Sequence, residues 1–307
     1  VTADSINNTG TLQSKGASTL NVATAFTNSG TTINQGNLTL RGTDAAYSVN
    51  MTGRLESLAT LDIKGQNGGN GVEITVGNTG ILKGATLAVN SQKLDVQGDA
   101  TAGGMVNTSG AMTVNTTQLT MGGIKSRIVA GAGNSVITVT NDFSNRGAIY
   151  AAGNLGFKAK SITNTNTGGM AASGNLTAEA TQGNFDNSGA LYAADTLTAK
   201  ASQTFINRGA LANEVGTMDA GSAINITANT VSNQSSINSQ GGIAISATTF
   251  HNDVYGGDTR YWTEVANSGD KYDKTDSWYD FPDDYEREYW YRTRRTEQKF
   301  AGGTPTF

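Results

Sequence analysis

The chain contains a single histidine, His251, and no cysteine. A Ser-His-Asp triad needs a histidine as its general base, and zinc sites are built mainly from cysteine and histidine. His251 lies between Phe250 and Asn252, inside a turn signature that recurs along the chain. We therefore interpret His251 as a turn residue and predict no hydrolytic triad, no metal centre and no cofactor.

Four acidic residues lie close together near the C-terminal end of the chain: Asp283, Asp284, Glu286 and Glu288. Two carboxylates at a suitable separation could act as a glycosidase pair, but a run of this kind is more often a solvated surface. Lyases and hydrolases that act on polysaccharides from a β-helix need clustered charges on one flank. Here the outward positions carry mainly Ser, Thr, Asn and Ala. We predict no enzyme and keep a polysaccharide-active enzyme as a distant alternative.

Residues 68–76, Gly-Gly-Asn-Gly-Val-Glu-Ile-Thr-Val, resemble one calcium-binding nonapeptide with Glu at the Asp position. Such sites need tandem copies because each ion is shared between successive turns, and the chain holds one copy. Asp270, Asp273 and Asp276 lack the spacing and the central Gly of an EF-hand. We therefore assign no calcium site.

The elements that must position any site come from a short unit that repeats most clearly between Phe143 and Phe250. Each copy opens with an apolar residue, any residue and Asn, usually with Gly two places on, and an alternating apolar stretch follows about ten residues later. The Asn residues of these copies are spaced 19, 23, 20, 26 and 19 residues apart. A period of this size is typical of a solenoid. The recurrent turn Asn residues of the whole chain are Asn8, Asn28, Asn78, Asn145, Asn164, Asn187, Asn207, Asn233 and Asn252.

The alternation of apolar and polar residues predicts half-buried strands. One unit of about 20 residues cannot bury its apolar side alone, whereas stacked units can. We predict an all-β fold, a single-stranded parallel β-helix of about 12 rungs, whose hand the sequence does not give. Asn at the same point of successive rungs should form a side-chain ladder. Between the strands lie Asn-x-Gly and Gly-Asn pairs, which tolerate positive φ and should turn the chain sharply. An antiparallel sandwich of hairpins is the competing interpretation.

Regular copies of the unit occupy residues 1–40 and 143–252, and the pattern is less regular over residues 41–142. We predict that residues 1–252 form the β-helix and that residues 253–307 form a capping or exit segment. The irregular stretch predicts longer loops or rungs of another cross-section. Such rungs could carry a binding face or could reflect drift without function.

The C-terminal segment is rich in Tyr and Trp. Its aromatic side chains could cover the last rung, or they could contact a partner, since Tyr, Trp and Arg are favoured at contact hot spots. Our candidate receptor-binding residues are Tyr255, Tyr261, Trp262, Trp278, Tyr279, Tyr285, Arg287, Tyr289, Trp290 and Tyr291.

The net charge of −4 is spread thinly over 307 residues, and charged residues make up 15% of them. No basic stripe is present, so we do not expect nucleic acid as a partner. The sequence contains no run of 18 apolar residues, so we do not predict a membrane-spanning helix. The first residues, Val1-Thr-Ala-Asp, begin in mid-pattern without a Met or a signal peptide, and we interpret the chain as a piece of a longer protein.

The opening Phe/Ile-x-Asn-x-Gly, the middle segments Ile149-Tyr-Ala-Ala-Gly153 and Leu191-Tyr-Ala-Ala-Asp195, and the closing Leu-x-Ala-x-Ala resemble a known repeat. It is similar to the haemagglutinin repeat of filamentous haemagglutinin and of CdiA-type proteins of contact-dependent growth inhibition. The resemblance implies a right-handed β-helical filament, exported by a two-partner secretion transporter and held at a Gram-negative cell surface. We expect it to be monomeric within one long filament.

Two functional hypotheses follow from the resemblance. The chain could be a receptor-binding segment of a CdiA-type effector that recognises an outer-membrane protein or lipopolysaccharide on a neighbouring bacterium and serves toxin delivery. Alternatively, it could be a structural stalk of an adhesin. A groove of aromatic and charged side chains on residues 41–142 or 251–307 would favour receptor binding, and a uniform Ser, Thr and Asn surface would favour the stalk.

Overall fold

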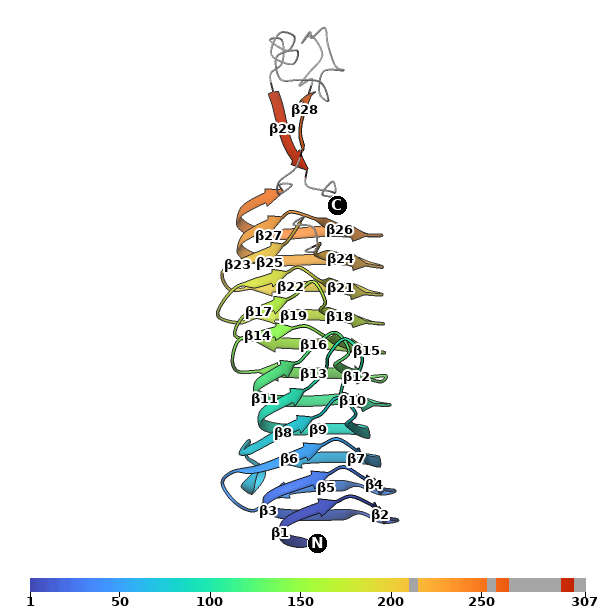
Figure 1. Ribbon diagram of the computed structural model, residues 1–307. Coiled ribbons are helices and arrows are strands. Elements are labelled where there is room, and N and C mark those ends of the chain that lie inside the picture. Colours follow the sequence, from blue (N-terminus) through green and yellow to red (C-terminus); the bar gives the residue numbers. More distant parts are fainter. Residues whose placement is uncertain (210–214, 253–257, 265–293, 301–307) are drawn as a thin grey trace.

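The computed structural model of the protein describes residues 1–209, 215–252, 258–264 and 294–300. Strands β1 to β27 form one continuous parallel network that coils into a rod of about 12 stacked rungs (Figure 1). The predicted parallel β-helix is therefore confirmed, and the antiparallel sandwich is excluded. A full rung contributes a short strand to each of three sheets, which we call sheets I, II and III in the order in which the chain passes through them.

Sheet I begins each rung. Its members are β2 (Thr11–Ser14), β4 (Thr31–Asn34), the first parts of β7 (Arg54–Lys64) and β9 (Ile81–Val96), β10 (Met105–Thr108), β12 (Arg127–Ala130), β15 (Ala148–Ala151), β18 (Gly169–Ala172), β21 (Ala190–Ala193), β24 (Thr217–Ala220) and β26 (Ser236–Ser239).

Sheet II follows at the next side of the rung. Its members are the first part of β3 (Ser18–Asn28), β5 (Leu38–Gly42), the second part of β7, the middle of β9, the first part of β11 (Met112–Met121), β13 (Asn134–Val139), β16 (Asn154–Ala159), β19 (Leu176–Ala180), β22 (Thr196–Ala201), and the first parts of β25 (Ala223–Asn233) and β27 (Gly242–Asn252).

Sheet III closes each rung. Its members are β1 (Thr2–Asn8), the ends of β3, β9, β11, β25 and β27, and the separate strands β6 (Tyr47–Met51), β8 (Val72–Val76), β14 (Phe143–Asn145), β17 (Ile162–Asn164), β20 (Phe185–Asn187) and β23 (Thr204–Asn207). Outside the rod network, β28 (Asp258–Glu264) pairs antiparallel with β29 (Arg294–Phe300). A short 3-10 turn, η1, spans Gln66–Gly68.

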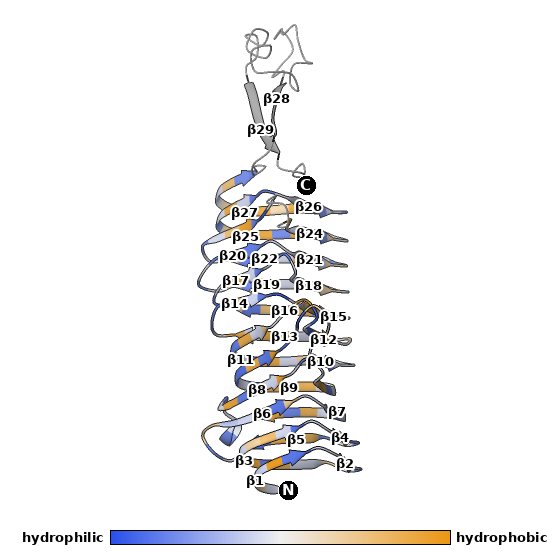
Figure 2. Ribbon diagram, viewed as in Figure 1, coloured by the Kyte–Doolittle hydropathy of each residue, from blue (hydrophilic) through white to orange (hydrophobic). Residues whose placement is uncertain are grey.

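The core is a set of in-register columns of apolar side chains that run along the axis. In β5 and β19, buried and half-buried residues alternate along the strand, and Figure 2 shows hydrophobic and hydrophilic residues alternating in the same way. The pairing places Phe185 between Ile162 and Phe205, and the rings of Phe185 and Phe205 meet edge to face at 5.2 Å. Stacking therefore buries what one rung cannot bury alone.

The less regular stretch 41–142 keeps the three-strand rung. β7 pairs with β9, and β9 pairs with β11, with register shifts confined to the corner between Ser57 and Thr60. The extra residues form corner loops, of which the loop with η1 after β7 is one. The irregular sequence therefore corresponds to longer loops leaving the coil, not to another cross-section.

The turn glycines are needed for space. Among the described residues, positive φ occurs at Asn67, Gly68 and Gly133. The Gly-Asn pair Gly133-Asn134 therefore uses positive φ, whereas the glycines of Asn-x-Gly turns such as Gly189 do not. A Cβ on Gly189 would lie 2.2 Å from the carbonyl oxygen of Gly168. Turns of successive rungs thus stack backbone on backbone, and only a residue without a side chain fits.

We expect Gly189→Ala to lower the free energy of unfolding by about 1–3 kcal/mol, because the added methyl group forces neighbouring turns apart. Gly156→Ala is the control, since a Cβ there would meet its nearest atom at 3.8 Å. Urea unfolding followed by far-UV circular dichroism measures both. Equal stability of the two variants would show that the turns separate without cost.

Candidate functional site

A ladder of Asn side chains runs inside sheet III. Each Asn is the last residue of its strand and sits just before the turn, with its amide pointing along the axis. In the N-terminal rungs, Asn8 Nδ2 donates to Asn28 Oδ1 at 2.8 Å. The C-terminal block runs from Asn145 through Asn164, Asn187, Asn207 and Asn233 to Asn252, with Nδ2–Oδ1 distances of 2.9, 2.8, 2.9, 2.9 and 2.9 Å.

The same amides also fasten the turns. Asn164 Nδ2 donates to the carbonyl oxygen of Ala190 at 3.3 Å, and Asn187 Nδ2 donates to that of Thr217 at 3.3 Å. Each acceptor is the first residue of the sheet I strand that follows the next Asn of the ladder: Ala190 follows Asn187, and Thr217 follows Asn207. Because both Asn side chains are fully buried, every bond in the ladder replaces a contact with water that the interior does not offer.

Four rungs interrupt the ladder. The register places Met51 above Asn28, followed by Val76, Val96 and Met121 in the same column. Asn78 lies two residues beyond this column, in the turn itself, and its Nδ2 donates to Asp99 Oδ2 at 2.8 Å. The ladder predicted from the repeat therefore does not include Asn78, because its rung fills the column with Val76.

Asn78 instead belongs to a polar corner loop around Asp99. The backbone N–H of Ala102, the hydroxyl of Thr101 and its backbone N–H all donate to Asp99 Oδ1 at 2.6–2.9 Å. These hydrogen bonds, with a further one from Asn78, hold the pKa of Asp99 at about 2. The carboxylate is a loop-fixing acceptor and has no proton to give near neutral pH.

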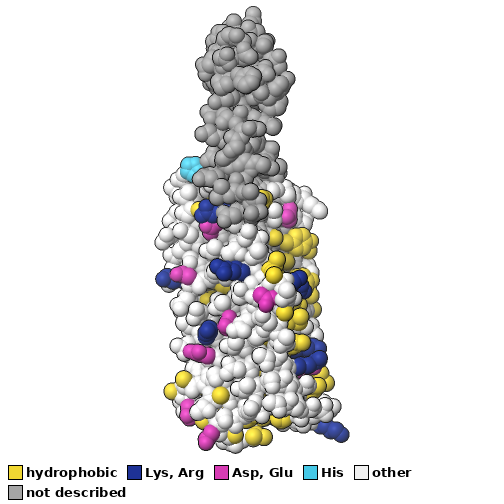
Figure 3. Space-filling view, viewed as in Figure 1, with side chains coloured by type: hydrophobic (Ala, Val, Ile, Leu, Met, Phe, Trp, Pro, Cys, Tyr) yellow, Lys and Arg dark blue, Asp and Glu magenta, His cyan; other side chains and the backbone are white. Residues whose placement is uncertain are grey.

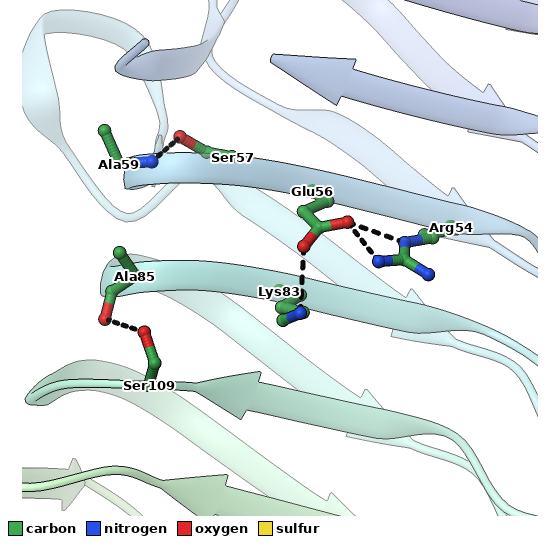
Figure 4. A network of polar contacts seen from close by, with 7 residues as sticks. All are labelled: Arg54, Glu56, Ser57, Ala59, Lys83, Ala85 and Ser109. Atoms are coloured by element: carbon green, nitrogen blue, oxygen red, sulfur yellow. Dashed lines mark hydrogen bonds and ion pairs between the residues drawn. The ribbon is translucent and has the colours of Figure 1, made fainter. Parts of the chain in front are cut away.

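A charged cluster lies on the outer side of sheet I around Glu56 (Figure 4). Arg54 Nε donates to Glu56 Oε2 at 2.8 Å, and Lys83 Nζ of the next rung contacts Glu56 Oε1 at 2.9 Å. Glu56 is only 3% exposed. Burial acts to raise the pKa of Glu56, but the hydrogen bonds and positive charges of Lys83 and Arg54 outweigh it, so its pKa is lowered.

Glu56 should therefore make stability depend on pH. A lowered folded-state pKa stabilises the fold above the ordinary value of 4.5, and this contribution is lost as the pH falls through the folded-state pKa. We expect Glu56→Gln to cost about 1 kcal/mol at neutral pH, because its partners are partly exposed, and nothing at strongly acidic pH. Unfolding midpoints of both proteins, measured from about pH 2 to about pH 7, test this dependence. Parallel profiles would contradict it.

A second charged arrangement lies at the turns after sheet III. Arg208 donates to both carboxylate oxygens of Asp186, one rung away, with Nε distances of 2.6 and 2.8 Å. Together with Arg146, Thr163 and Thr165 they line an open cleft of about 520 Å³. Its walls carry guanidinium and hydroxyl groups beside the Asp186 carboxylate, and these groups could hold a small polar ligand.

Of the remaining candidates, the structure describes His251, Tyr261, Trp262 and Glu73. His251 is exposed on β27 and pairs in register with Ser232. Tyr261 and Trp262 lie in β28, opposite Glu297 and Thr296. The other candidate receptor-binding residues and the acidic run 283–288 lie outside the described residues. Glu73, the acidic residue of the nonapeptide-like stretch 68–76, lies in β8 and points outward. Within the described ranges, no three His, Cys, Asp or Glu side chains come together in a way that could hold a metal ion.

The cluster around Glu56 and the Arg208–Asp186 pair were missed from the sequence. Their members stand 22 to 27 residues apart, apart from the neighbouring Arg54 and Glu56, so only the register between rungs reveals them. The sequence signal for the second pair is an Asp and an Arg about one repeat apart, namely Asp186 and Arg208. In the part of the chain that the structure describes, no helix has the length and apolar character to cross a membrane.

Comparison with known proteins points to one family. The haemagglutinin repeat matches residues 1–65, 115–170 and 171–261, about two thirds of the chain. No curated protein and no solved structure matches. The matched ranges hold the Asn ladder and its turns, and the chain belongs to the haemagglutinin repeat family.

Proposed function

We propose that the chain is a stalk segment of a filamentous surface adhesin. The observation that carries the proposal is the unbroken stacking of about 12 similar rungs. On the face that Figure 3 shows, charged and hydrophobic side chains cover only a small part of the described surface. At ~4.8 Å per rung such a rod spans on the order of 60 Å. Its stability comes from nearest-neighbour contacts, so rungs can be added to give reach without changing the structure.

The family supports an extracellular place of action. Haemagglutinin repeats are typical of proteins that a two-partner secretion transporter exports to the surface of Gram-negative bacteria. A chain without cysteine also suits export in an unfolded state. Under this proposal the transporter is the partner needed for export, and the rod itself holds other parts of the protein away from the cell.

Residues 41–142 offer no exposed aromatic side chain to a groove of the kind that receptor binding would favour. Within residues 41–142 the single tyrosine, Tyr47, is buried, and burial raises its pKa. Its hydroxyl lies within hydrogen-bonding distance of the carbonyl oxygens of Leu40 and Lys64. The aromatic side chain of this stretch is therefore a core residue and is not available to a partner.

A receptor-binding segment of the CdiA type is the second candidate. It would contact an outer-membrane protein or lipopolysaccharide of a neighbouring bacterium. The charged cluster of Arg54, Glu56 and Lys83 lies within residues 41–142 and favours this hypothesis, since three charged side chains meet there. The candidate residues Tyr255 to Tyr291 belong to the same hypothesis.

Binding of the labelled chain to intact Gram-negative cells distinguishes the stalk hypothesis from the receptor-binding hypothesis. A stalk predicts no saturable binding to a panel of cells. Saturable binding that is lost when the chain ends at Asp253 would assign the aromatic segment to a receptor. Saturable binding that survives truncation but is lost in Arg54→Gln, Lys83→Gln would assign the cluster. Far-UV circular dichroism of each variant shows that the rod is still folded.

A further inference from the structure

One stretch of sheet I differs from the rest of the surface. From β12 to β24 its outward positions form two rows in register along the axis. The first row is Arg127, Ala148, Gly169, Ala190 and Thr217, and the second is Val129, Tyr150, Ala171, Tyr192 and Asp219. The centre of this stretch is a flat surface of Ala and Gly residues, and the side chains of Tyr150 and Tyr192 project from it.

The two tyrosines are exposed. Tyr150 is 37% exposed and Tyr192 is 47% exposed, and Tyr150 Oη lies 2.7 Å from Ser173 Oγ. Figure 3 shows hydrophobic side chains gathered along one side of the rod, with Lys and Arg side chains beside them. Tyrosine offers a large apolar ring with a polar tip, which suits a surface that is wet when free and covered when bound.

The stretch is balanced about Ala171. Tyr150 lies one rung before it and Tyr192 one rung after it, so each ring is ~4.8 Å along the axis from the centre. Arg127 lies two rungs before Ala171, and Asp219 lies two rungs after it. Equal distances on the two sides, with opposite charges at the two ends, are what a self-complementary interface requires.

We propose that two copies of this chain pack sheet I against sheet I with their long axes antiparallel, about a two-fold axis that runs along β18 at Ala171. The rotation brings Tyr150 of one copy against Tyr192 of the other, twice. It also brings Arg127 beside Asp219 of the second copy, twice. The offset of two residues along the strand between these rows is within the reach of an arginine side chain.

The charges select the antiparallel arrangement. With the axes parallel and the rungs level, Arg127 would lie at the same level as Arg127 of the second copy and Asp219 at the same level as Asp219, and like charges brought close together are unfavourable. Asp219 Oδ1 accepts a hydrogen bond from Asn238 at 2.9 Å, which holds the carboxylate in place. In the described residues no partner is found for its Oδ2, the atom that Arg127 of the second copy would reach.

The small residues of this surface leave space for the tyrosine rings in the proposed dimer. Ala148, Gly169, Ala171 and Ala190 leave room for the four tyrosine rings to lie down between two sheets packed about 10 Å apart. This association departs from the expectation of a monomer within a single filament. It joins rods that run in opposite directions, as filaments on two facing cells do.

Charge reversal tests the arrangement. Sedimentation velocity of the full chain should show a dimer, and Arg127→Asp or Asp219→Arg alone should weaken association by at least about tenfold, because two like-charge pairs replace two opposite ones. An equimolar mixture of the two variants should dimerise again, since the mixed pair restores both contacts. Far-UV circular dichroism confirms that these surface variants remain folded.

A thiol probe tests the position of the two-fold axis. The chain has no cysteine, so Ala171→Cys carries a single thiol, and a short bis-maleimide should link two copies through it. Thr177→Cys on sheet II is the matched control and should stay unlinked at the same protein concentration. Tyr192→Ser should abolish the cross-link of the Ala171→Cys protein.

Several outcomes would overturn the proposal. A wild-type chain that is monomeric at its highest soluble concentration would do so, as would single charge reversals that associate like the wild type. A mixture of the two reversed variants that stays monomeric would exclude the antiparallel arrangement. Binding of oligosaccharides to a monomer, lost in Tyr192→Ser, would assign the tyrosines to glycan recognition instead.

Discussion

Replacing Asn187 by alanine is expected to lower the free energy of unfolding by about 2–4 kcal/mol, since each buried polar group left without a partner costs about 1–3 kcal/mol. Asn187 Oδ1 accepts from Asn164 Nδ2 at 2.8 Å, and its own Nδ2 donates to Asn207 Oδ1 at 2.9 Å. Both neighbours are fully buried. The substitution therefore deprives Asn164 of an acceptor and Asn207 of a donor, with no water to replace either.

Hydrogen exchange measures the effect where it arises. In a solenoid, the stability of a rung depends on its neighbours, so amides of β17, β20 and β23 should exchange faster in Asn187→Ala than those of the N-terminal rungs. Asn78→Ala is the matched control, since Asn78 lies outside the ladder and partly exposed in a turn; its cost should stay within about 0.5 kcal/mol. Equal exchange in the two variants would show that the ladder adds no stability.

Phe185→Ala is expected to have the largest effect of all, a loss of about 3–5 kcal/mol, as for other fully buried aromatic residues replaced by alanine. Phe185 is fully buried and stacks in register between Ile162 and Phe205. The backbone of the rung is held by pairing on both sides, so it cannot collapse to fill the cavity. The cost therefore includes the void as well as the lost apolar contact.

Urea unfolding followed by far-UV circular dichroism is the suitable measurement, because its signal arises from the backbone of the rungs, whereas all three Trp residues lie after residue 252. Leu58→Ala is the control, since Leu58 is 55% exposed and should change stability by less than about 0.5 kcal/mol. A Phe185→Ala protein that unfolds at the wild-type urea concentration would mean that the rung repacks around the missing ring.

The division of the Asn column into two blocks follows from the chemistry of a buried amide. An Asn in this column hydrogen-bonds to an Asn in the neighbouring rung, which favours runs of polar rungs and runs of apolar rungs. At the end of the first block, Asn28 Nδ2 donates to the carbonyl oxygen of Arg54 at 2.8 Å. At the start of the second block, Asn145 Oδ1 accepts from the backbone N–H of Gly147 at 3.2 Å. Both boundary residues thus find backbone partners.

Much of the fold could be predicted because it depends on local alternation and on the repeat length. The strand Leu176–Ala180 alternates buried and half-buried residues as its sequence does. The Asn residues of the regular copies pair in one column because the same unit brings them to the same point of each rung. The rungs of residues 41–142 are harder to predict from the sequence. There the apolar residues Met51 and Val76 take the place of Asn, so no recurrent Asn shows where each rung ends.

The amino-acid sequence by itself therefore determined the strands, the parallel coil, the approximate number of rungs and most members of the ladder. Tertiary structure alone decided the side-chain partners between rungs: Glu56 with Lys83, Asp186 with Arg208, and the balanced rows about Ala171. It also showed that Gly189 is required by the close approach of the preceding turn. The physical reason is that corner loops vary in length, so sequence spacing does not fix which residues face each other until backbone pairing sets the register.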